Sequence, residues 1–139
     1  MIIRRIYDPE LIREVARLDW DNIAADNQSN FDEFLPDVNA DRFFGGFVAG
    51  EIVGIVMLKD KDEHTAAHII TVPEKKAYAY ILAKRALNHA KMPVQTEIPD
   101  NYLNVIKFAE YLGFKEIGRR KEGWVKNGIA GDLIIMRLR

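Results

Sequence analysis

A short strand followed at once by a long helical pattern is the feature that most constrains the fold of this chain. The apolar, β-branched run from His68 to Val72 ends at Pro73, and small and apolar residues then recur at helical spacing from Lys75 to Lys91. Proline leaves a strand but fits the first turn of a helix. The free backbone N–H groups of such a turn are a common binding place for phosphate. The junction is therefore a candidate ligand site, on a helix expected to pack against a sheet.

The other predicted elements complete a single α+β domain over residues 1–139. A first helix begins at Asp8 and Pro9, where an aspartate cap and an N-terminal proline favour helix formation. Ala49-Gly50 favours a hairpin turn, and Gly113 ends a helix that is predicted from Asn101 to Leu112. A short helix is also expected near residues 31–35. The predicted strands are 2–7, 42–48, 51–58, 65–72, 94–98, 114–120 and 132–138. Most neighbours in this order are joined by short connections, which predicts a mostly antiparallel sheet.

Composition and charge narrow the possible partners. The 139 residues carry a net charge of −1, so the sequence does not favour binding to nucleic acid or to an anionic membrane surface. No apolar run approaches the ~20 residues that span a bilayer. The chain has no cysteine, and its three histidines are dispersed, so we expect neither a disulfide nor a metal site. The first five residues do not resemble a signal peptide, and a cytoplasmic location is expected.

Four short motifs occur along the chain in a specific order. They are Gly50 to Gly54 (GEIVG), Val72 to Glu74 (VPE), Phe108 to Gly118 (FAEYLGFKEIG) and Asp132 to Met136 (DLIIM). Together, over nearly the whole length, they resemble the GNAT superfamily of acetyltransferases. The resemblance implies a GNAT-like fold with a central, mostly antiparallel sheet of six to seven strands and about four flanking helices. It also implies direct transfer of an acetyl group from acetyl-CoA to an amine.

The resemblance implies where acetyl-CoA would bind. Its pyrophosphate would lie at the junction after Val72, and its pantetheine arm would pass between the fourth and fifth strands. The implied cofactor-binding residues are Ile70, Val72, Lys75, Lys76, Ala77, Tyr78, Ala79 and Asn104. The chain departs from the family here, because Ala77, Ala79 and Ile81 stand where the family has glycines. Each adds a side chain where the backbone should approach phosphate.

The resemblance also implies two candidate catalytic residues. His68 lies on the fourth strand, where the family places a base, and an imidazole that titrates near neutral pH suits amine deprotonation. Glu97 ends the fifth strand, where it could bind the amine or act as the base. The alternatives are a structural histidine and a solvated carboxylate. Ala109 stands where the family has the tyrosine that protonates the leaving thiolate, and Tyr111 lies on a different face of the same helix.

Two functions remain open at this point. The first is a GNAT-like N-acetyltransferase with an altered cofactor loop, acting on an unidentified amine. An acidic cluster at Asp19, Asp21 and Asp26 would then suit a cationic amine, unless it is only a solvated loop. The second is a non-catalytic GNAT-fold protein that binds a protein partner, for example in a phage particle, where its location would be the virion. In either case a homodimer or an assembly partner is possible, as is common in the family.

Overall fold

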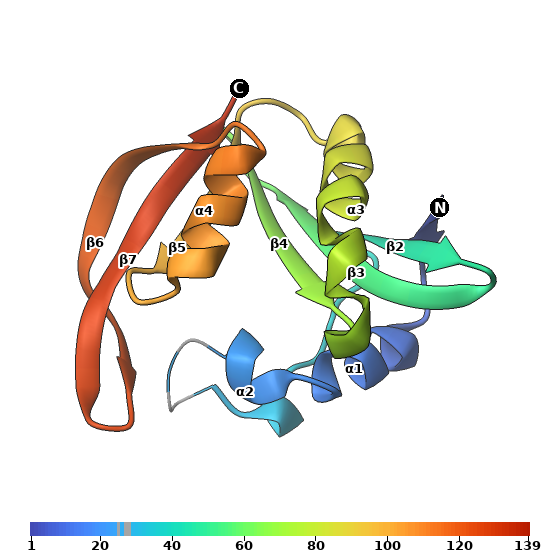
Figure 1. Cartoon of the computed structure of the whole chain (residues 1–139), viewed down its shortest axis with the longest axis horizontal. Helices are drawn as coiled ribbons and strands as arrows, with labels where there is room; N and C mark the ends of the chain where they lie inside the picture. Colours follow the sequence, from blue (N-terminus) through green and yellow to red (C-terminus); the bar gives the residue numbers. More distant parts are fainter. Residues whose placement is uncertain (25, 27–28) are drawn as a thin grey trace.

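The computed structural model describes residues 1–24, 26 and 29–139, and these form one seven-stranded sheet with helices on both faces (Figure 1). The strands are β1 (Ile2–Ile6), β2 (Arg42–Val48), β3 (Glu51–Asp60), β4 (Thr65–Thr71), β5 (Val94–Pro99), β6 (Lys115–Lys126) and β7 (Ile129–Leu138). The α-helices are α1 (Pro9–Arg17), α2 (Trp20–Ile23), α3 (Ala79–Ala86) and α4 (Leu103–Tyr111). Three 3₁₀ segments join them, η1 (Phe31–Glu33), η2 (Pro73–Tyr78) and η3 (Leu87–His89).

The sheet is split between its fourth and fifth strands. The strand order is β1-β2-β3-β4-β5-β7-β6, and all neighbours are antiparallel except β4 and β5. The parallel pair is short, since only Thr65 with Val94 and Ala66 with Gln95 are in register. Beyond these two pairs the strands diverge, while β4 stays paired with β3 and β5 with β7. The predicted α+β class and mostly antiparallel sheet are confirmed, and the split leaves a gap in the middle of the sheet.

Two hydrophobic clusters hold the helices on opposite faces of the sheet. One cluster joins α3 and α4 to the sheet and includes Leu82, Ala86 and Ala109 with Ala67 and Ile98. The other packs α1 on the opposite face, with Ile12, Val15 and Ala16 against Phe43, Ile55 and Ile70. Residues of one strand alternate between the two faces. Thus Ala67 and Ile70, three positions apart on β4, belong to different clusters.

The helix ends follow the local sequence in α1 and depart from it in α3. The Asp8 side chain accepts a hydrogen bond from the backbone N–H of Glu10 at 3.0 Å, and Pro9 is the first helical residue, as predicted. The helix predicted from Lys75 to Lys91 is instead η2, α3 and η3 in sequence. Lys75 has non-helical dihedral angles (φ −116°, ψ 17°), so the α-helix begins only at Ala79. The predicted helix near residues 31–35 is the single 3₁₀ turn η1, and α2 was not predicted.

The last hairpin is longer than the sequence analysis predicted. The strands predicted at 114–120 and 132–138 extend to Lys126 and begin at Ile129, and the turn between them is Asn127-Gly128 (φ 53° and 77°). Asn-Gly is the strongest two-residue hairpin signal. Gly131, which precedes the strand predicted at 132–138, lies within β7 opposite Trp124, and the buried indole leaves no room for a side chain there. Within the described residues, no helix has the length and apolar character that crossing a bilayer requires.

The hairpin between β2 and β3 offers a stability test. Both turn residues have positive φ, 50° at Ala49 and 80° at Gly50. Alanine is strained in this region by about 1–2 kcal/mol, whereas asparagine tolerates it. We expect Ala49→Asn to raise the free energy of unfolding by about 0.5–1 kcal/mol and Ala49→Val to lower it, both measured by urea unfolding. Equal midpoints for the two variants would contradict the assigned turn geometry.

Candidate functional site

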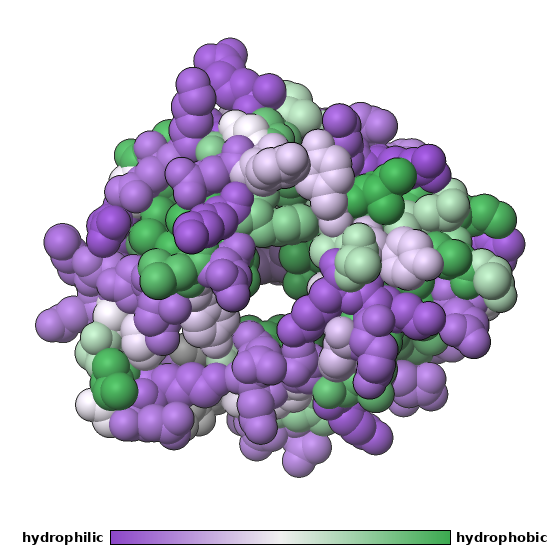
Figure 2. All heavy atoms as spheres, in the orientation of Figure 1, coloured by the Kyte–Doolittle hydropathy of each residue, from purple (hydrophilic) through white to green (hydrophobic). Residues whose placement is uncertain are grey.

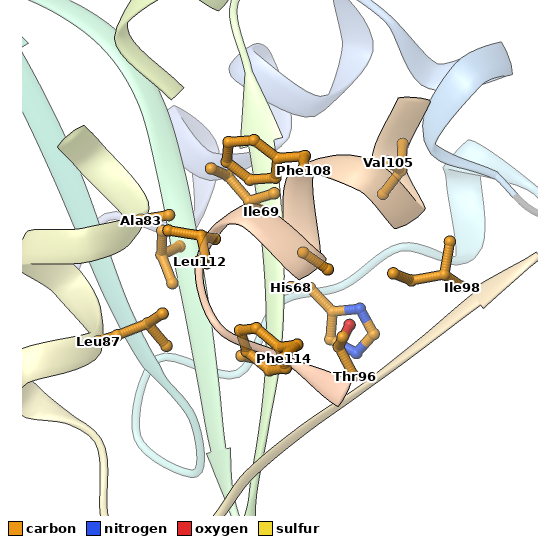
Figure 3. A pocket seen from close by; sticks show the side chains of 13 residues that line it. His68, Ile69, Ala83, Leu87, Thr96, Ile98, Val105, Phe108, Leu112 and Phe114 are labelled. Carbon is orange, nitrogen blue, oxygen red and sulfur yellow. The ribbon is translucent and has the colours of Figure 1, made fainter. Parts of the chain in front are cut away.

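An apolar cleft occupies the split between β4 and β5, on the side covered by α3 and α4 (Figure 3). Its volume is about 60 Å³. The walls come from β4 (Ala67 and Ile69), β5 (Thr96 and Ile98), α3 (Ala83) and α4 (Val105, Phe108 and Ala109). The cleft exists because β4 and β5 lose their mutual hydrogen bonds beyond Ala66 and Gln95, so that α4 packs over an interrupted part of the sheet.

His68 and Glu97 lie on the two strands that border this split. Ala67 and Ile69 face α3 and α4, so His68 between them points toward the opposite face. Thr96 and Ile98 line the cleft in the same way, which directs Glu97 to the face that His68 also occupies. Figure 3 shows the imidazole in the split, beside Thr96. The two residues that the sequence analysis proposed as catalytic are therefore brought to one side of one gap.

The surroundings of His68 favour its neutral form. Solvent reaches the ring, but protein surrounds much of it where it lines the cleft. Desolvation is the main cause that lowers the pKa of His68 below its usual 6.5; the nearby charge of Glu97 acts against this shift. Lys59 and Lys61 lower the pKa further, and Asp41 raises it. The net direction is downward, so the ring is mainly unprotonated and able to accept a proton at neutral pH.

Glu97 is held by a partner from the neighbouring hairpin. Its Oε2 atom lies 2.7 Å from Nη2 of Arg120 on β6, and both side chains are substantially exposed. Exposed ion pairs contribute little to stability. This pair fixes the direction of the carboxylate instead. Arg120 was not recognised in the sequence, where nothing relates its position to that of Glu97.

The junction after β4 carries two lysines that already have acidic partners. Nζ of Lys75 lies 3.7 Å from Glu51, and Nζ of Lys76 lies 3.7 Å from Asp19. Both ion pairs are long, and of the four side chains only Asp19 is largely shielded from solvent. The pairs are therefore weak, and each lysine can exchange its carboxylate partner for another anion. Ala77 is exposed, and its methyl group points into no cavity that the structure describes.

The bulky residues of the junction leave the cleft open. Tyr78, Tyr80 and Ile81 do not contribute to its lining. Tyr80 instead packs edge-on against Tyr111 of α4, with ring centroids 5.4 Å apart. The aromatic pair connects α3 and α4 outside the cleft, so the altered loop does not obstruct the split.

The backbone of β4 offers hydrogen-bonding groups to the split, but not those that the sequence analysis named. The N–H group of Val72 donates to the carbonyl of Val53 at 3.0 Å. Because backbone groups alternate between the two edges of a strand, Ile70 is also directed to β3. Ile69 and Thr71 direct their backbone groups toward the split. Any hydrogen bonds from β4 to a ligand in the split therefore come from these two residues rather than from Ile70 and Val72.

The two α4 positions discussed in the sequence analysis have different surroundings. Ala109 is buried and lines the cleft, so the position that holds a tyrosine in the GNAT resemblance faces the site but carries no acidic proton. Tyr111 is 80% exposed and points away from the cleft, as its helical spacing predicted. Asn104 lies exposed in the first turn of α4 and does not line the cleft.

The short helix α2 crosses the open side of the split and has a lysine partner at each end. Asp19 precedes α2 and faces Lys76 of the junction. After the helix, Nζ of Lys126 on β6 donates to the carbonyls of Asp21 and Ala24, the latter at 3.0 Å. We call residues 19–24 the α2 strap. Figure 2 shows an opening at the centre of this view, just above the strap, with hydrophilic side chains gathered beside it.

The described residues contain no group of three or more histidine, aspartate or glutamate side chains placed to hold a metal ion.

Solved structures with the same architecture include spermidine N-acetyltransferases. No protein-family model matches the chain, and no curated protein matches it by sequence. Spermidine N-acetyltransferase from Vibrio cholerae, in complex with CoA and spermine, aligns over 99% of this chain and 94% of its own, with 22% identity and a TM-score of 0.79. A chimera of the V. cholerae enzyme SpeG with hSSAT aligns over 99% and 96%, with 21% identity and a TM-score of 0.79.

The chain has the GNAT fold. The fold inferred from four short motifs is thus confirmed by structures that cover the chain almost completely. At this level of identity the comparison establishes the architecture.

Proposed function

We propose that this GNAT-fold protein is an N-acetyltransferase that transfers the acetyl group of acetyl-CoA to an amine. One observation carries the proposal: the β4–β5 split is open, lined by apolar side chains, and bordered on its other side by His68 and Glu97. A slender, mostly apolar arm fits such a cleft, while a polar acceptor approaches from the opposite face. SpeG, which shares the fold, has been solved with CoA and spermine bound.

The residues of the cleft and of the junction suit the arm and the phosphates of acetyl-CoA, respectively. The cleft provides apolar contacts for the arm, and backbone groups of Ile69 and Thr71 face it. Lys75 and Lys76 would hold the phosphates through their ammonium groups, since the N–H group of Ala79 already donates to the carbonyl of Lys76. The weak pairs with Glu51 and Asp19 would then exchange for stronger contacts with phosphate oxygens. Asn104, at the start of α4, would contact the same molecule from the other side of the split.

The side chains divide the chemistry between them. Acetyl-CoA supplies the activated thioester. As the new amide bond forms between the amine nitrogen and the carbonyl carbon, the C–S bond breaks. His68 accepts the proton that the nitrogen loses, directly or through a water molecule. Glu97 faces the same gap and stabilises the resulting imidazolium and a cationic acceptor. Ala109 cannot protonate the departing thiolate, so this proton comes from water.

A cationic amine is the acceptor class that we propose. Asp19 and Asp21 belong to the α2 strap, which packs on the α1 face of the sheet, the face toward which Glu97 points. Carboxylates at this position attract ammonium groups and raise their local concentration. Spermine, which is bound in the solved V. cholerae complex, belongs to this class.

Ligand-induced stabilisation and product formation test the proposal together. We expect acetyl-CoA at about 100 times its dissociation constant to stabilise the fold by about 2.7 kcal/mol, seen as a higher melting temperature. Lys76→Gln should reduce this shift, whereas Lys115→Gln, on the distant β6 strand, should leave it unchanged. Incubation with acetyl-CoA and spermidine should release CoA and give an acetylated amine by mass spectrometry. The absence of any shift at millimolar acetyl-CoA would refute the proposal.

A non-catalytic role in binding a protein partner, as in a phage particle, is the second candidate. It is favoured by the exposed apolar side chains of the last hairpin, Ile117 at 51%, Val125 at 49% and Ile129 at 64% exposure. Such a module would show no response to acetyl-CoA. The melting experiment therefore separates the two candidates.

A further inference from the structure

We propose that the acceptor carries a carboxylate as well as an amine, as a basic amino acid does, and that Arg137 and Arg120 bind this carboxylate. The proposal rests on the proposed function, because it narrows the acceptor class of the same site. It is carried by the half-buried guanidinium group of Arg137, which has an unoccupied edge and lies on the same side of the sheet as Glu97.

Arg137 and Glu97 share the side of β5, β7 and β6 that points away from α4. Thr96 and Ile98 line the cleft beneath α4, so Gln95 and Glu97, which alternate with them, point the other way. Gln95 is in register with Arg137, which places Arg137 on that side too. There, α1 packs on β3 and β4, and its hydrophobic cluster includes no described residue of β5, β6 or β7 (Figure 1). We call this side of β5, β7 and β6 the open face, and it borders the split.

The guanidinium group of Arg137 uses only one of its edges. Its Nε atom donates to Oε1 of Gln95 at 3.0 Å, and its Nη2 atom donates to the same oxygen. The edge formed by Nη1 and Nη2 has the spacing that binds a carboxylate through two parallel hydrogen bonds. In the described part of the chain, Arg137 forms an ion pair with no carboxylate. Because a partly buried charge is costly without a charged partner, this edge favours an anion from solution.

Arg120 supplies a second guanidinium group on the open face. Its Nη2 atom lies 2.7 Å from Oε2 of Glu97, and the two side chains remain 60% and 41% exposed. Arg137 is a diagonal neighbour of Glu97 across β5 and β7, a relation that places Cα atoms about 7–8 Å apart. Lys115 of β6 is in register with Arg137. Cationic side chains thus outnumber the carboxylate of Glu97 here. A molecule with an ammonium group for Glu97 and a carboxylate for the arginines matches both charges.

The positions of the split and of Arg137 set the length of the acceptor. The split lies between β4 and β5, and β7 is the next strand beyond β5. Because neighbouring strands are about 4.8 Å apart, an amine in the split beside His68 is roughly 7–10 Å from the backbone of β7. The extended chain of lysine or ornithine covers part of this distance, and the arginine side chain covers the rest. Both amino acids also end in an amine on an unbranched chain, which suits transfer beside His68.

Acceptors that differ only by a carboxylate provide the direct test. Cadaverine is lysine without its carboxylate, and putrescine has the same relation to ornithine. With purified protein and acetyl-CoA, kcat/KM should be higher for lysine than for cadaverine by about tenfold or more, the usual contribution of hydrogen bonds between charged groups. The binding of each compound in the presence of CoA is measured in parallel by calorimetry, so that the preference is observed without turnover.

Removal of a guanidinium group should abolish the preference. Arg137→Gln should bring the lysine-to-cadaverine ratio of kcat/KM close to one and should change kcat/KM for cadaverine little. Arg120→Gln, at a more exposed position, should also lower the ratio and replaces the first variant if that one is unstable. Arg119→Gln is the matched control, because it removes the same charge from the neighbouring residue, which faces the α4 side and pairs with Glu116 at 3.1 Å. Its ratio should equal that of the wild type.

The outcomes distinguish this inference from the proposed function. A kcat/KM for cadaverine that equals or exceeds that for lysine would overturn the inference and leave the acetyltransferase proposal intact. A lysine-to-cadaverine ratio that is unchanged in both Arg137→Gln and Arg120→Gln would also overturn it. If no amine is acetylated, the proposed function fails, and the calorimetric comparison of lysine with cadaverine then decides whether the open face binds a carboxylate.

Discussion

Replacement of His68 by glutamine should lower kcat/KM for acyl transfer by about 10²–10⁴-fold, the usual contribution of a positioned general base. The side chain borders the β4–β5 split, and burial lowers its pKa, so the proton-accepting form predominates at neutral pH. Glutamine keeps a similar size and polarity but cannot take up the proton. The affinity for acetyl-CoA should change little, because the arm is held mainly by the apolar walls and by backbone groups of β4.

The pH profile distinguishes a base from a merely structural histidine. Activity of the wild type should rise with pH through the pKa of His68, which lies below its usual 6.5, and then level off. The charge of Glu97 raises that pKa, so Glu97→Gln should move the rise to still lower pH. Lys59 and Lys61 lower the pKa of His68, so Lys61→Gln should move the rise in activity to higher pH. A profile that is unchanged in both variants would exclude His68 as the base.

Gly54→Ala should destabilise the protein by about 3 kcal/mol, since overpacking of a filled core costs about 1–3 kcal/mol and sometimes more. A methyl group at this buried position of β3 would lie 2.7 Å from the carbonyl oxygen of Ile70 and 2.8 Å from Cδ2 of Leu82. The first is a backbone atom of β4 and cannot move alone, and the second belongs to α3. The melting temperature should fall by roughly 10 °C.

The same substitution should also weaken the binding of acetyl-CoA, because moving α3 away from the sheet displaces the η2 junction that precedes it. Gly118→Ala is the matched control. Nothing lies within 4 Å of the added methyl group there, so its stability should stay within about 0.5 kcal/mol of the wild type. Equal melting temperatures for the two variants would show that α3 does not approach β3 as closely as described.

Local patterns predicted the elements better than their ends. The cap at Asp8 and Pro9 and the Ala49-Gly50 turn depend only on neighbouring residues, and both were predicted correctly. The delayed start of α3 depends on the dihedral angles of Lys75, which nothing in the helical spacing indicates. The Asn127-Gly128 turn did carry a sufficient signal. It lies between the predicted strands because Gly123 and Gly131 interrupt the strand pattern, whereas Gly131 is required by the buried Trp124 opposite it.

The sequence predicted where in the fold the candidate site lies, but not which backbone groups and side chains contact one another there. The strand-to-helix junction located the split, and the resemblance to GNAT enzymes directed attention to His68 and Glu97. The edge of β4 that faces the split depends on its register with β3, and a shift of one residue exchanges the two edges. Sequence reasoning therefore named Ile70 and Val72 where Ile69 and Thr71 face the gap. Lys126 and Arg120 act across long sequence separations, and no local pattern predicts such contacts.

The α2 strap has a consequence for the shape of any acceptor. Lys126 holds the far end of the strap, so protein continues across the open side of the split, next to the opening seen in Figure 2. A molecule that reaches His68 from this side passes under the α2 strap and enters with one end first. A thin, unbranched chain with a terminal amine fits through this narrow opening, whereas an amine on the surface of a folded protein is too wide to enter.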